Sequence, residues 1–312
     1  MNHLIKFGVK CFCYLLFITP EFIRHFLGKS FGIFWFDIIR FRRKIVLHNL
    51  TLAFPDLTLD EKIQIGRASL IDLCISFFET FTLPLLDKKW MDENIVFHGL
   101  EHCEMALQKG RGILFLSMHV GHGDMAINMI SLKGIPISVI TKKFSNKLSN
   151  DIWFQIRGQH GSQFIEAHGP KTAFEILRNC RENKGVIFVI DQHMGPPYGI
   201  DTTFFGHRVG TAYGLALFAL KTKAPVIPVY TYRDLQNKTH IVFDSEIPLI
   251  PRGLADEDKS HKETEEEKQN YLRNMTQVYN DYIEGIVKKH PDKWMWIHKR
   301  WKGWSENKYN EL

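Results

Sequence analysis

From residue 95 onward, short apolar runs alternate with stretches of helical character. The strand-like runs are NIVFHGL, GILFLSM, ISVIT, GVIFVI, APVIPVYTY and HIVFD, and several of them have no alternating polar residues. Helical stretches separate them near residues 124–132, 147–157, 170–182 and 211–222. Strands buried on both faces and alternating with helices are typical of a parallel sheet. We therefore expect an α/β fold with a central, mostly parallel sheet flanked by helices.

Helices are predicted on both sides of this region. Residues 40–85 have helical character, and Thr58 followed by Glu61 three residues later is typical of a capping box at a helix start. A last helix is expected over about 267–289, and the charged segment 254–268 is expected to be a solvated loop leading into it. We find no internal repeat, so residues 46–312 are predicted to form one domain behind an N-terminal segment.

The N-terminal segment, residues 1–45, is basic, aromatic and apolar. Residues 1–50 hold eight Lys or Arg against two acidic residues, so the whole net charge of +6 falls there. The apolar run CFCYLLFIT ends at Pro20, and FGIFWFDII contains Asp37, so neither run reaches the roughly 20 apolar residues of a spanning helix. We expect two helices that lie in the cytoplasmic leaflet of a membrane. The alternative is a buried helical hairpin in a soluble protein.

Composition excludes two other classes of protein. The five cysteines are scattered and odd in number, which favours a reducing compartment and argues against a disulfide framework. Basic charge is not spread over the body of the chain as nucleic-acid binding requires, so no nucleic-acid partner is expected.

The candidate site is the segment SMHVGHGD, residues 117–124, directly after the apolar run GILFL. His119 is expected beyond the carboxyl end of a strand, where reactive groups gather in open α/β sheets. Asp124 is expected in the first turn of the next helix, from which a carboxylate can hold one imidazole nitrogen and leave the other as a general base. A nucleophile elbow and glycine-rich phosphate loops are absent from the sequence. A base without its own nucleophile suits attack by a substrate hydroxyl on an activated acyl group.

A metal site is the alternative interpretation of the same residues. His119, His122 and Asp124 form H-x-x-H-x-D, with Asp191 and His193 as further possible ligands. The spacing differs by one residue from that of metallo-hydrolases, and zinc needs a tighter cluster. We expect no metal and no cofactor. A metal-dependent hydrolase and a non-catalytic lipid-binding protein remain the competing functions.

Five blocks of the chain, in order, resemble the bacterial lipid A late acyltransferases of the lauroyl/myristoyl type. The blocks are RRKIVLHNLTLAFPD (42–56), the His-x4-Asp of residues 119–124, RGQHG (157–161), VIDQ followed by TTFFGHRVGTAYG (189–214), and HPDKWMWIHKRWK (290–302). The residues before the acid differ, because Gly121-His122-Gly123 stands where proteobacterial members usually have Gly-Asn-Trp.

The resemblance implies a membrane-associated enzyme of the glycerolipid-acyltransferase fold on the cytoplasmic face of the inner membrane, peripheral or monotopic. It implies transfer of a fatty acyl chain from acyl-acyl carrier protein to a hydroxyl of a lipid A precursor, or of another membrane glycolipid. His119 would be the base and Asp124 its partner. The implied substrate-binding residues are Arg157, Asp191, Phe205, Gly206 and Arg300. The tryptophans and basic residues of 294–304, Arg300 among them, are expected to form a patch that faces phosphate or the membrane.

Overall fold

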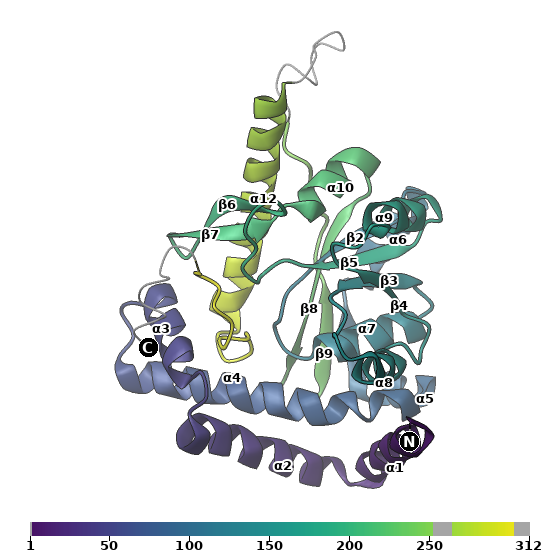
Figure 1. Ribbon diagram of the computed structural model, residues 1–312, viewed down its shortest axis with the longest axis vertical. Helices are drawn as coiled ribbons and strands as arrows, with labels where there is room; N and C mark the ends of the chain where they lie inside the picture. Colours follow the sequence, from purple (N-terminus) through teal and green to yellow (C-terminus); the bar gives the residue numbers. More distant parts are fainter. Residues whose placement is uncertain (1, 252–263, 303–312) are drawn as a thin grey trace.

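A seven-stranded sheet forms the centre of the computed structural model, which describes residues 2–251 and 264–302 (Figure 1). The strand order is β1-β9-β8-β2-β5-β3-β4, and all neighbours are parallel except β8 and β9. The strands of this sheet are β1 (Ile95–His98), β2 (Ile113–Ser117), β3 (Ile137–Thr141), β4 (Gln163–Glu166), β5 (Gly185–Val189), β8 (Val226–Arg233) and β9 (Thr239–Phe243). A separate antiparallel hairpin consists of β6 (Gly199–Phe204) and β7 (His207–Ala212).

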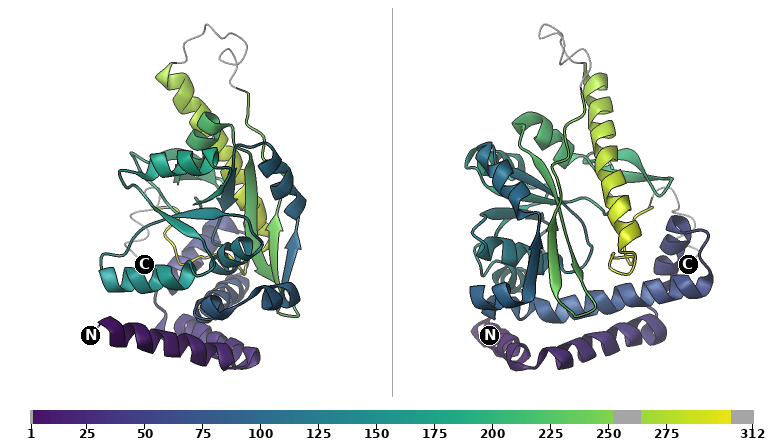
Figure 2. Two further views of the ribbon diagram at one scale, coloured as in Figure 1. Left: turned by 90° about the vertical axis from the view of Figure 1, so that its right-hand side faces the viewer. Right: turned by 180° about the vertical axis from the view of Figure 1, so that it is seen from behind.

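Helices cover both faces of the sheet (Figure 2). Alternate residues of β2 point to opposite faces, so Leu114 and Leu116 join one buried cluster while Ile113 and Phe115 join the other. The first cluster contains side chains of α9 (Thr172–Arg181), α10 (Gly214–Thr222) and α12 (Glu265–Lys289). The second contains side chains of α5 (Lys88–Asn94), α6 (Leu100–Gln108) and α7 (Gly123–Leu132). This arrangement confirms the predicted α/β class.

The predicted elements agree with the structure at most positions. All six strand-like runs are strands, and the four predicted helical stretches are α7, α8 (Lys147–Arg157), α9 and α10. β4, the β6–β7 hairpin, α5 and α6 were not predicted. Most of the charged segment 254–268 lies outside the described residues, and its last residues begin α12 behind a capping box at Thr264.

The N-terminal helices lie together at one end of the molecule. They are α1 (Asn2–Ile18), α2 (Glu21–Ile33), the π-helix η1 (Phe34–Ile39), α3 (Arg43–Ala53) and α4 (Leu59–Thr80), followed by the 3₁₀ turn η2 (Leu83–Leu85). α4 begins with the predicted capping box and runs across the end of the sheet at which β8 turns into β9, with α2 on its outer side (Figures 1 and 2).

Two glycines allow α2 and α4 to approach closely. A Cβ atom on Gly28 would lie 2.7 Å from Ile75 Cγ1, and one on Gly32 would lie 2.6 Å from Ile71 Cα. Only glycine fits at such backbone contacts. Within the described residues, no helix has the length and apolar character needed to cross a membrane.

Candidate active site

The site lies where the central strands β2 and β5 end. The two strands are parallel neighbours, and their register pairs Ser117 with Val189. His119 and Asp191 therefore each lie two residues beyond the same step of the ladder, at the carboxyl edge of the sheet. This is the position at which open α/β sheets gather their reactive groups.

Asp191 holds His119 through two hydrogen bonds. Its Oδ1 is 2.8 Å from His119 Nδ1, and its Oδ2 accepts from the His119 backbone N–H at 2.8 Å. Oδ2 also accepts from Trp294 Nε1 at 2.7 Å, and only 1% of the Asp191 side chain is exposed. The His119 side chain is 37% exposed, so the ring is fixed on its Nδ1 side and remains open to a substrate.

Electrostatics match this geometry. Burial alone would lower the pKa of His119, but the charge of Asp191 and its hydrogen bond outweigh burial and raise that pKa. Burial would raise the pKa of Asp191, but the charge of His119 and the hydrogen bonds from His119 and Trp294 hold it at about 2. Asp191 is thus an anion at neutral pH. The Nε2 atom of His119 lies 3.3 Å from the side-chain nitrogen of Gln192, which can donate to it when His119 carries its proton on Nδ1.

Asp124 has a different partner from the one predicted. Its Oδ1 accepts from Arg157 Nε at 2.6 Å, and its side chain is 17% exposed. No hydrogen bond joins Asp124 to His119 in the part of the chain that the structure describes. From the first turn of α7, the Asp124 carboxylate reaches Arg157 at the end of α8. Asp191 therefore takes the positioning contact predicted for Asp124, which acts on the imidazole only through its charge.

The Asp124–Arg157 pair organises the rim of the site. Arg157 is the last residue of α8, and its guanidinium also lies over the rings of Trp153 and Phe164, at 5.6 and 5.2 Å from the centroids. Only its Nε donates a hydrogen bond to the described residues. The two terminal amino groups are therefore available to an anionic or carbonyl group of a substrate.

The loop between β2 and α7 needs glycine at position 121. Gly121 has φ +64°, and a Cβ atom there would lie 2.3 Å from the carbonyl oxygen of Thr231. Its N–H donates to the carbonyl of Lys293 at 3.0 Å and is not free to stabilise an oxyanion. His122 caps α7, because its Nδ1 accepts from the Met125 N–H at 3.3 Å.

A C-terminal segment, residues 293–301, closes around the site; we call it the C-terminal strap. Trp294 forms a bridge with Val120, and the Met295 N–H donates to the His119 carbonyl at 3.0 Å. Further along the strap, Arg300 donates to the Gln192 carbonyl at 2.8 Å. The strap thus fixes both loops that carry the site, the one after β2 and the one after β5.

The same residues are not arranged as a metal centre. His119 binds Asp191 and Asp124 binds Arg157, while the Nε2 of His122 is directed to Glu79, 3.8 Å away. Within residues 2–251 and 264–302, no group of three His, Cys, Asp or Glu side chains could hold a metal ion. The side-chain directions therefore argue against the metal-dependent hydrolase.

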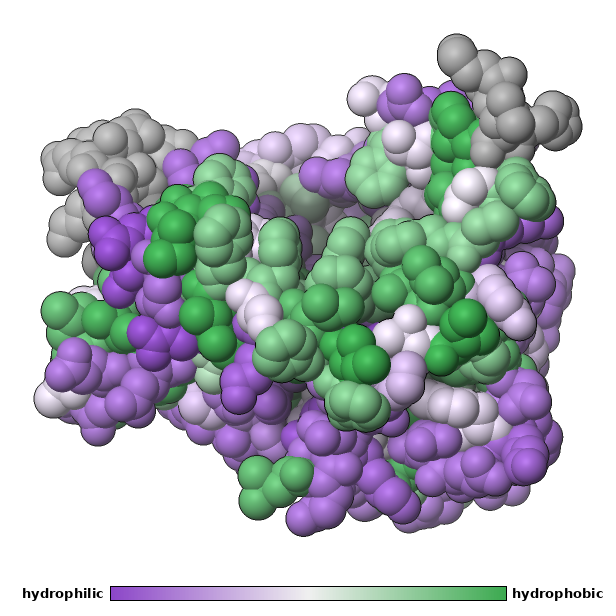
Figure 3. All heavy atoms as spheres, turned by 90° about the horizontal axis from the view of Figure 1, so that it is seen from below, coloured by the Kyte–Doolittle hydropathy of each residue, from purple (hydrophilic) through white to green (hydrophobic). Residues whose placement is uncertain are grey.

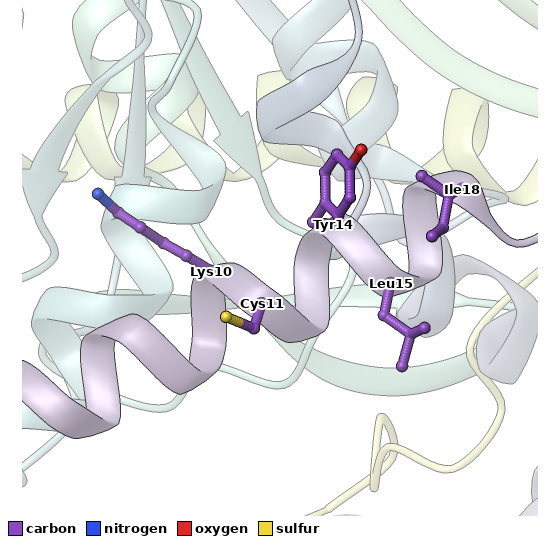
Figure 4. A pocket seen from close by; sticks show the side chains of 5 residues that line it. All are labelled: Lys10, Cys11, Tyr14, Leu15 and Ile18. Carbon is purple, nitrogen blue, oxygen red and sulfur yellow. The ribbon is translucent and has the colours of Figure 1, made fainter.

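A hollow of about 500 Å³ lies on α1, away from these residues (Figure 4). Lys10, Cys11, Tyr14, Leu15 and Ile18 line it, all from one helix. It contains no part of the pair formed by His119 and Asp191, so we assign it to the outer surface of α1 and not to the site.

A family model for bacterial lipid A biosynthesis acyltransferases matches residues 2–303. The chain belongs to this family. Its members are acyltransferases, so the pair at the ends of β2 and β5 is the candidate centre for acyl transfer.

Similar proteins carry related names. A lipid A biosynthesis acyltransferase of Haemophilus influenzae is 22% identical over 286 residues, which cover 92% of this chain and 84% of that protein. The lipid A biosynthesis palmitoleoyltransferase of Escherichia coli is 22% identical over 89% of this chain and 84% of its own length. A phosphatidylinositol mannoside acyltransferase of Mycolicibacterium smegmatis is 24% identical over 53% of this chain and 55% of that protein. Among solved structures, a 1-acyl-sn-glycerophosphate acyltransferase of Thermotoga maritima matches with a TM-score of 0.34 at 14% identity, over 86% of this chain and 98% of that one.

Arg300 does not face a substrate, in contrast to the prediction. It is fully buried, and its guanidinium donates to the carbonyls of Gln192 and Gly210, to Thr211 and to Asn280. Burial lowers its pKa to about 10. Trp294, Trp296 and Trp301 are also buried, so these three tryptophans and Arg300 pack in the interior and do not form the predicted outer patch. Lys302 is exposed, and Trp304 lies outside the described residues.

Phe205 and Gly206 form the turn of the β6–β7 hairpin. Phe205 is buried against Phe54 and Trp301, and its N–H donates to Glu284 at 2.5 Å. Gly206 is exposed. The structure places the ring of Phe205 in the packing between the hairpin, α12 and the C-terminal strap, and not beside His119.

Sequence reasoning missed the contacts that the strap makes. Trp294 was interpreted as a surface anchor, and its hydrogen bond to Asp191 has no local signal, since 103 residues separate the two. The useful signal for Asp191 was its place directly after an apolar strand, the same place that His119 has.

Proposed function

We propose that this protein transfers a fatty acyl chain from an acyl thioester to a hydroxyl of a lipid A precursor, with His119 as the general base. The hydrogen bond between His119 Nδ1 and Asp191, at the open edge of the sheet, is the observation that carries the proposal. It leaves Nε2 as the basic nitrogen on a ring that is 37% exposed.

The tautomer of His119 determines the path of the proton during acyl transfer. Nε2 accepts the proton of the acceptor hydroxyl as the oxygen attacks the thioester carbonyl. The tetrahedral intermediate collapses, the carbon–sulfur bond breaks, and the departing thiolate takes the proton back from Nε2. Asp191 stays ionised throughout and stabilises the imidazolium. General-base help of this kind contributes roughly 10²–10⁴-fold in rate.

Arg157 is the proposed contact for an anionic or carbonyl group of the substrate. Its carboxylate partner Asp124 fixes Nε, and two aromatic rings orient the guanidinium plane. A fixed guanidinium with two free amino groups is suited to carbonyl, carboxylate or phosphate oxygen.

We propose acyl-acyl carrier protein as the donor and a lipid A precursor as the acceptor. The names of the Haemophilus influenzae and Escherichia coli relatives support the acceptor. Another membrane glycolipid is the second candidate. It is favoured by the similarity to the mycobacterial phosphatidylinositol mannoside acyltransferase and by the absence of a bulky side chain at Gly123, on the rim of the site.

We further propose that residues 1–45 place the enzyme on the cytoplasmic face of the inner membrane. Figure 3 shows a broad band of hydrophobic residues on the side of the molecule where the N-terminal helices lie. In this segment, α1, α2, η1 and the turn after it carry exposed aromatic side chains. They are Phe7, Phe12, Tyr14, Phe17, Phe22, Phe26, Phe31, Phe34 and Phe41; we call this surface the apolar face. The exposed cations Lys10, Lys29 and Arg40 belong to the same segment. Aromatic and basic groups together suit a surface of hydrocarbon and anionic headgroups.

Mass spectrometry of cellular lipid A tests the acceptor and the base together. Cells that carry His119→Ala in place of the wild type, with equal protein levels, should lack one acyl chain of lipid A. An unchanged lipid A would contradict this acceptor, and the same extract would then be searched for another glycolipid that lacks an acyl chain.

A further inference from the structure

The C-terminal strap carries a second imidazole beside the catalytic pair. His298 lies between Met295, which binds the His119 carbonyl, and Arg300, which binds the Gln192 carbonyl. Its own backbone is fixed on both sides, because its carbonyl accepts from Asn49 Nδ2 at 2.8 Å and from the Arg300 N–H at 2.9 Å. The charges of Asp191 and His119 both act on its imidazole, so the ring lies next to the site.

The His298 ring is incompletely paired, and its surroundings favour the neutral form. Of its two nitrogens, only Nδ1 is buried without a hydrogen-bond partner among the described residues. Burial, together with the charges of His119, Arg300 and Arg42, lowers the pKa of His298 to about 4 against the opposing charge of Asp191. A proton on Nδ1 would be a buried, unpaired N–H, which is rare and costly in proteins. The neutral ring consequently carries its proton on Nε2.

We propose that His298 Nε2–H donates a hydrogen bond to the carbonyl oxygen of the acyl thioester and stabilises the oxyanion that forms there. This role rests on the proposed acyl transfer. The Gly121 N–H in the loop after β2 cannot serve as this donor, because it already donates to the Lys293 carbonyl. A neutral imidazole can polarise a carbonyl, and unlike a cation it does not repel the imidazolium that forms on His119.

A hydrogen bond from His298 adds no proton transfer to the reaction. His119 takes and returns the only proton that moves, and His298 keeps its Nε2 proton while the negative charge rises and falls on the carbonyl oxygen. His298 therefore acts on the donor half of the reaction. It should assist attack by any nucleophile, including water.

The test compares two substitutions that differ by one methylene. The side-chain nitrogen of glutamine in His298→Gln can reach the position of Nε2, whereas that of asparagine in His298→Asn reaches only the position of Nδ1. Transfer from lauroyl-acyl carrier protein to a lipid A precursor, and hydrolysis of the same donor without acceptor, are measured for both variants at equal concentrations of folded protein. His98→Gln, at the exposed last residue of the edge strand β1, is the control.

We expect His298→Asn to lower kcat for transfer by about 10²–10³-fold, as for the loss of one oxyanion donor, and to lower hydrolysis in parallel. His298→Gln should retain more activity than His298→Asn, and His98→Gln should match the wild type. Equal activity of His298→Asn and the wild type, greater activity of His298→Asn than of His298→Gln, or a loss of transfer with unchanged hydrolysis would overturn the assignment. A wild-type protein without transfer activity would instead contradict the proposed function.

Discussion

His119 and Asp191 lie 72 residues apart in the sequence and 2.8 Å apart in the structure, because each follows a paired parallel strand by two residues. The two residues lie side by side because the register of the sheet pairs the ends of their strands, and neither loop alone determines this. The register makes Asp191 the carboxylate that sets the tautomer of His119, the proposed base.

Replacing Asp191 should lower the rate of acyl transfer more than replacing Asp124. Asp191→Asn keeps one oxygen, which the His119 backbone N–H and Trp294 Nε1 hold, so its amino group faces His119 Nδ1. This favours the tautomer with its proton on Nε2, and kcat should fall by about 10²–10⁴-fold. Asp124→Asn leaves the hydrogen bond between His119 Nδ1 and Asp191 in place and should cost less. Steady-state transfer assays of both variants decide the order, and a greater loss in Asp124→Asn would contradict it.

Activity should fall at low pH with a dependence set by His119. Asp191 raises the pKa of His119, so protonation stops the base as pH falls through a value above its ordinary one of about 6.5. In Asp191→Asn the raising effect is lost and burial remains, so the residual activity should persist to lower pH. Profiles of kcat/KM against pH for both proteins measure the shift. If the fall of kcat/KM at low pH occurs in Asp191→Asn at the same pH as in the wild type, or at a higher pH, the result would contradict the effect of Asp191 on the pKa of His119.

The contributions of Asp124 and Arg157 to the free energy of unfolding should depend on each other. Both side chains are mostly buried, at 17% and 12% exposure, so removing one leaves the other poorly compensated. A double-mutant cycle with Asp124→Asn and Arg157→Gln should give a coupling free energy of about 1–3 kcal/mol in urea unfolding. Additive losses would mean that the pair contributes little.

Two glycines in the same loop should respond oppositely to alanine. Gly121→Ala places a Cβ against the Thr231 carbonyl at a positive φ, so the free energy of unfolding should fall by about 2–3 kcal/mol. Gly123→Ala meets nothing within 4 Å, and its stability should be unchanged or higher by up to about 1 kcal/mol. Thermal or urea unfolding of the two variants gives the comparison, and equal effects would disagree with the loop geometry.

Membrane binding should depend on the apolar face. Phe22 and Phe26 of α2 are 72% and 66% exposed, so Phe22→Asp with Phe26→Asp should abolish flotation with vesicles that contain anionic phospholipid. Phe174→Asp is the matched control, since Phe174 is 60% exposed on α9, at the opposite end of the molecule from α2. Undiminished flotation of the double variant would exclude the apolar face as the membrane-binding surface.

The sequence predicts those parts of the fold in which local pattern and burial agree. The β2 run is apolar throughout because helices cover both faces of the sheet. The capping box of α4 could also be predicted, because it needs only Thr58 and Glu61, which lie three residues apart in the sequence. β4 was missed because its four residues include Gln163 and Glu166, which are exposed.

The site was predicted in part, for a related reason. His119 follows from its strand, but its partner depends on which strands are neighbours. Asp124 is close in sequence, and helix geometry turns it to Arg157 instead. Arg300 resembles a surface cation in a run of basic residues, and only the tertiary fold provides the carbonyl, hydroxyl and amide oxygens that keep it buried. Contacts between distant segments decide each of these cases.

The most direct test of the account is a double-mutant cycle for acyl transfer. Rates from lauroyl-acyl carrier protein to a lipid A precursor are measured for the wild type, His119→Ala, Asp191→Asn and the double variant. If Asp191 acts through His119, the double variant should be as slow as His119→Ala alone, because residues that act as a unit are not additive. A double variant slowed by the product of the two single losses would contradict the claim that Asp191 acts on catalysis by holding His119.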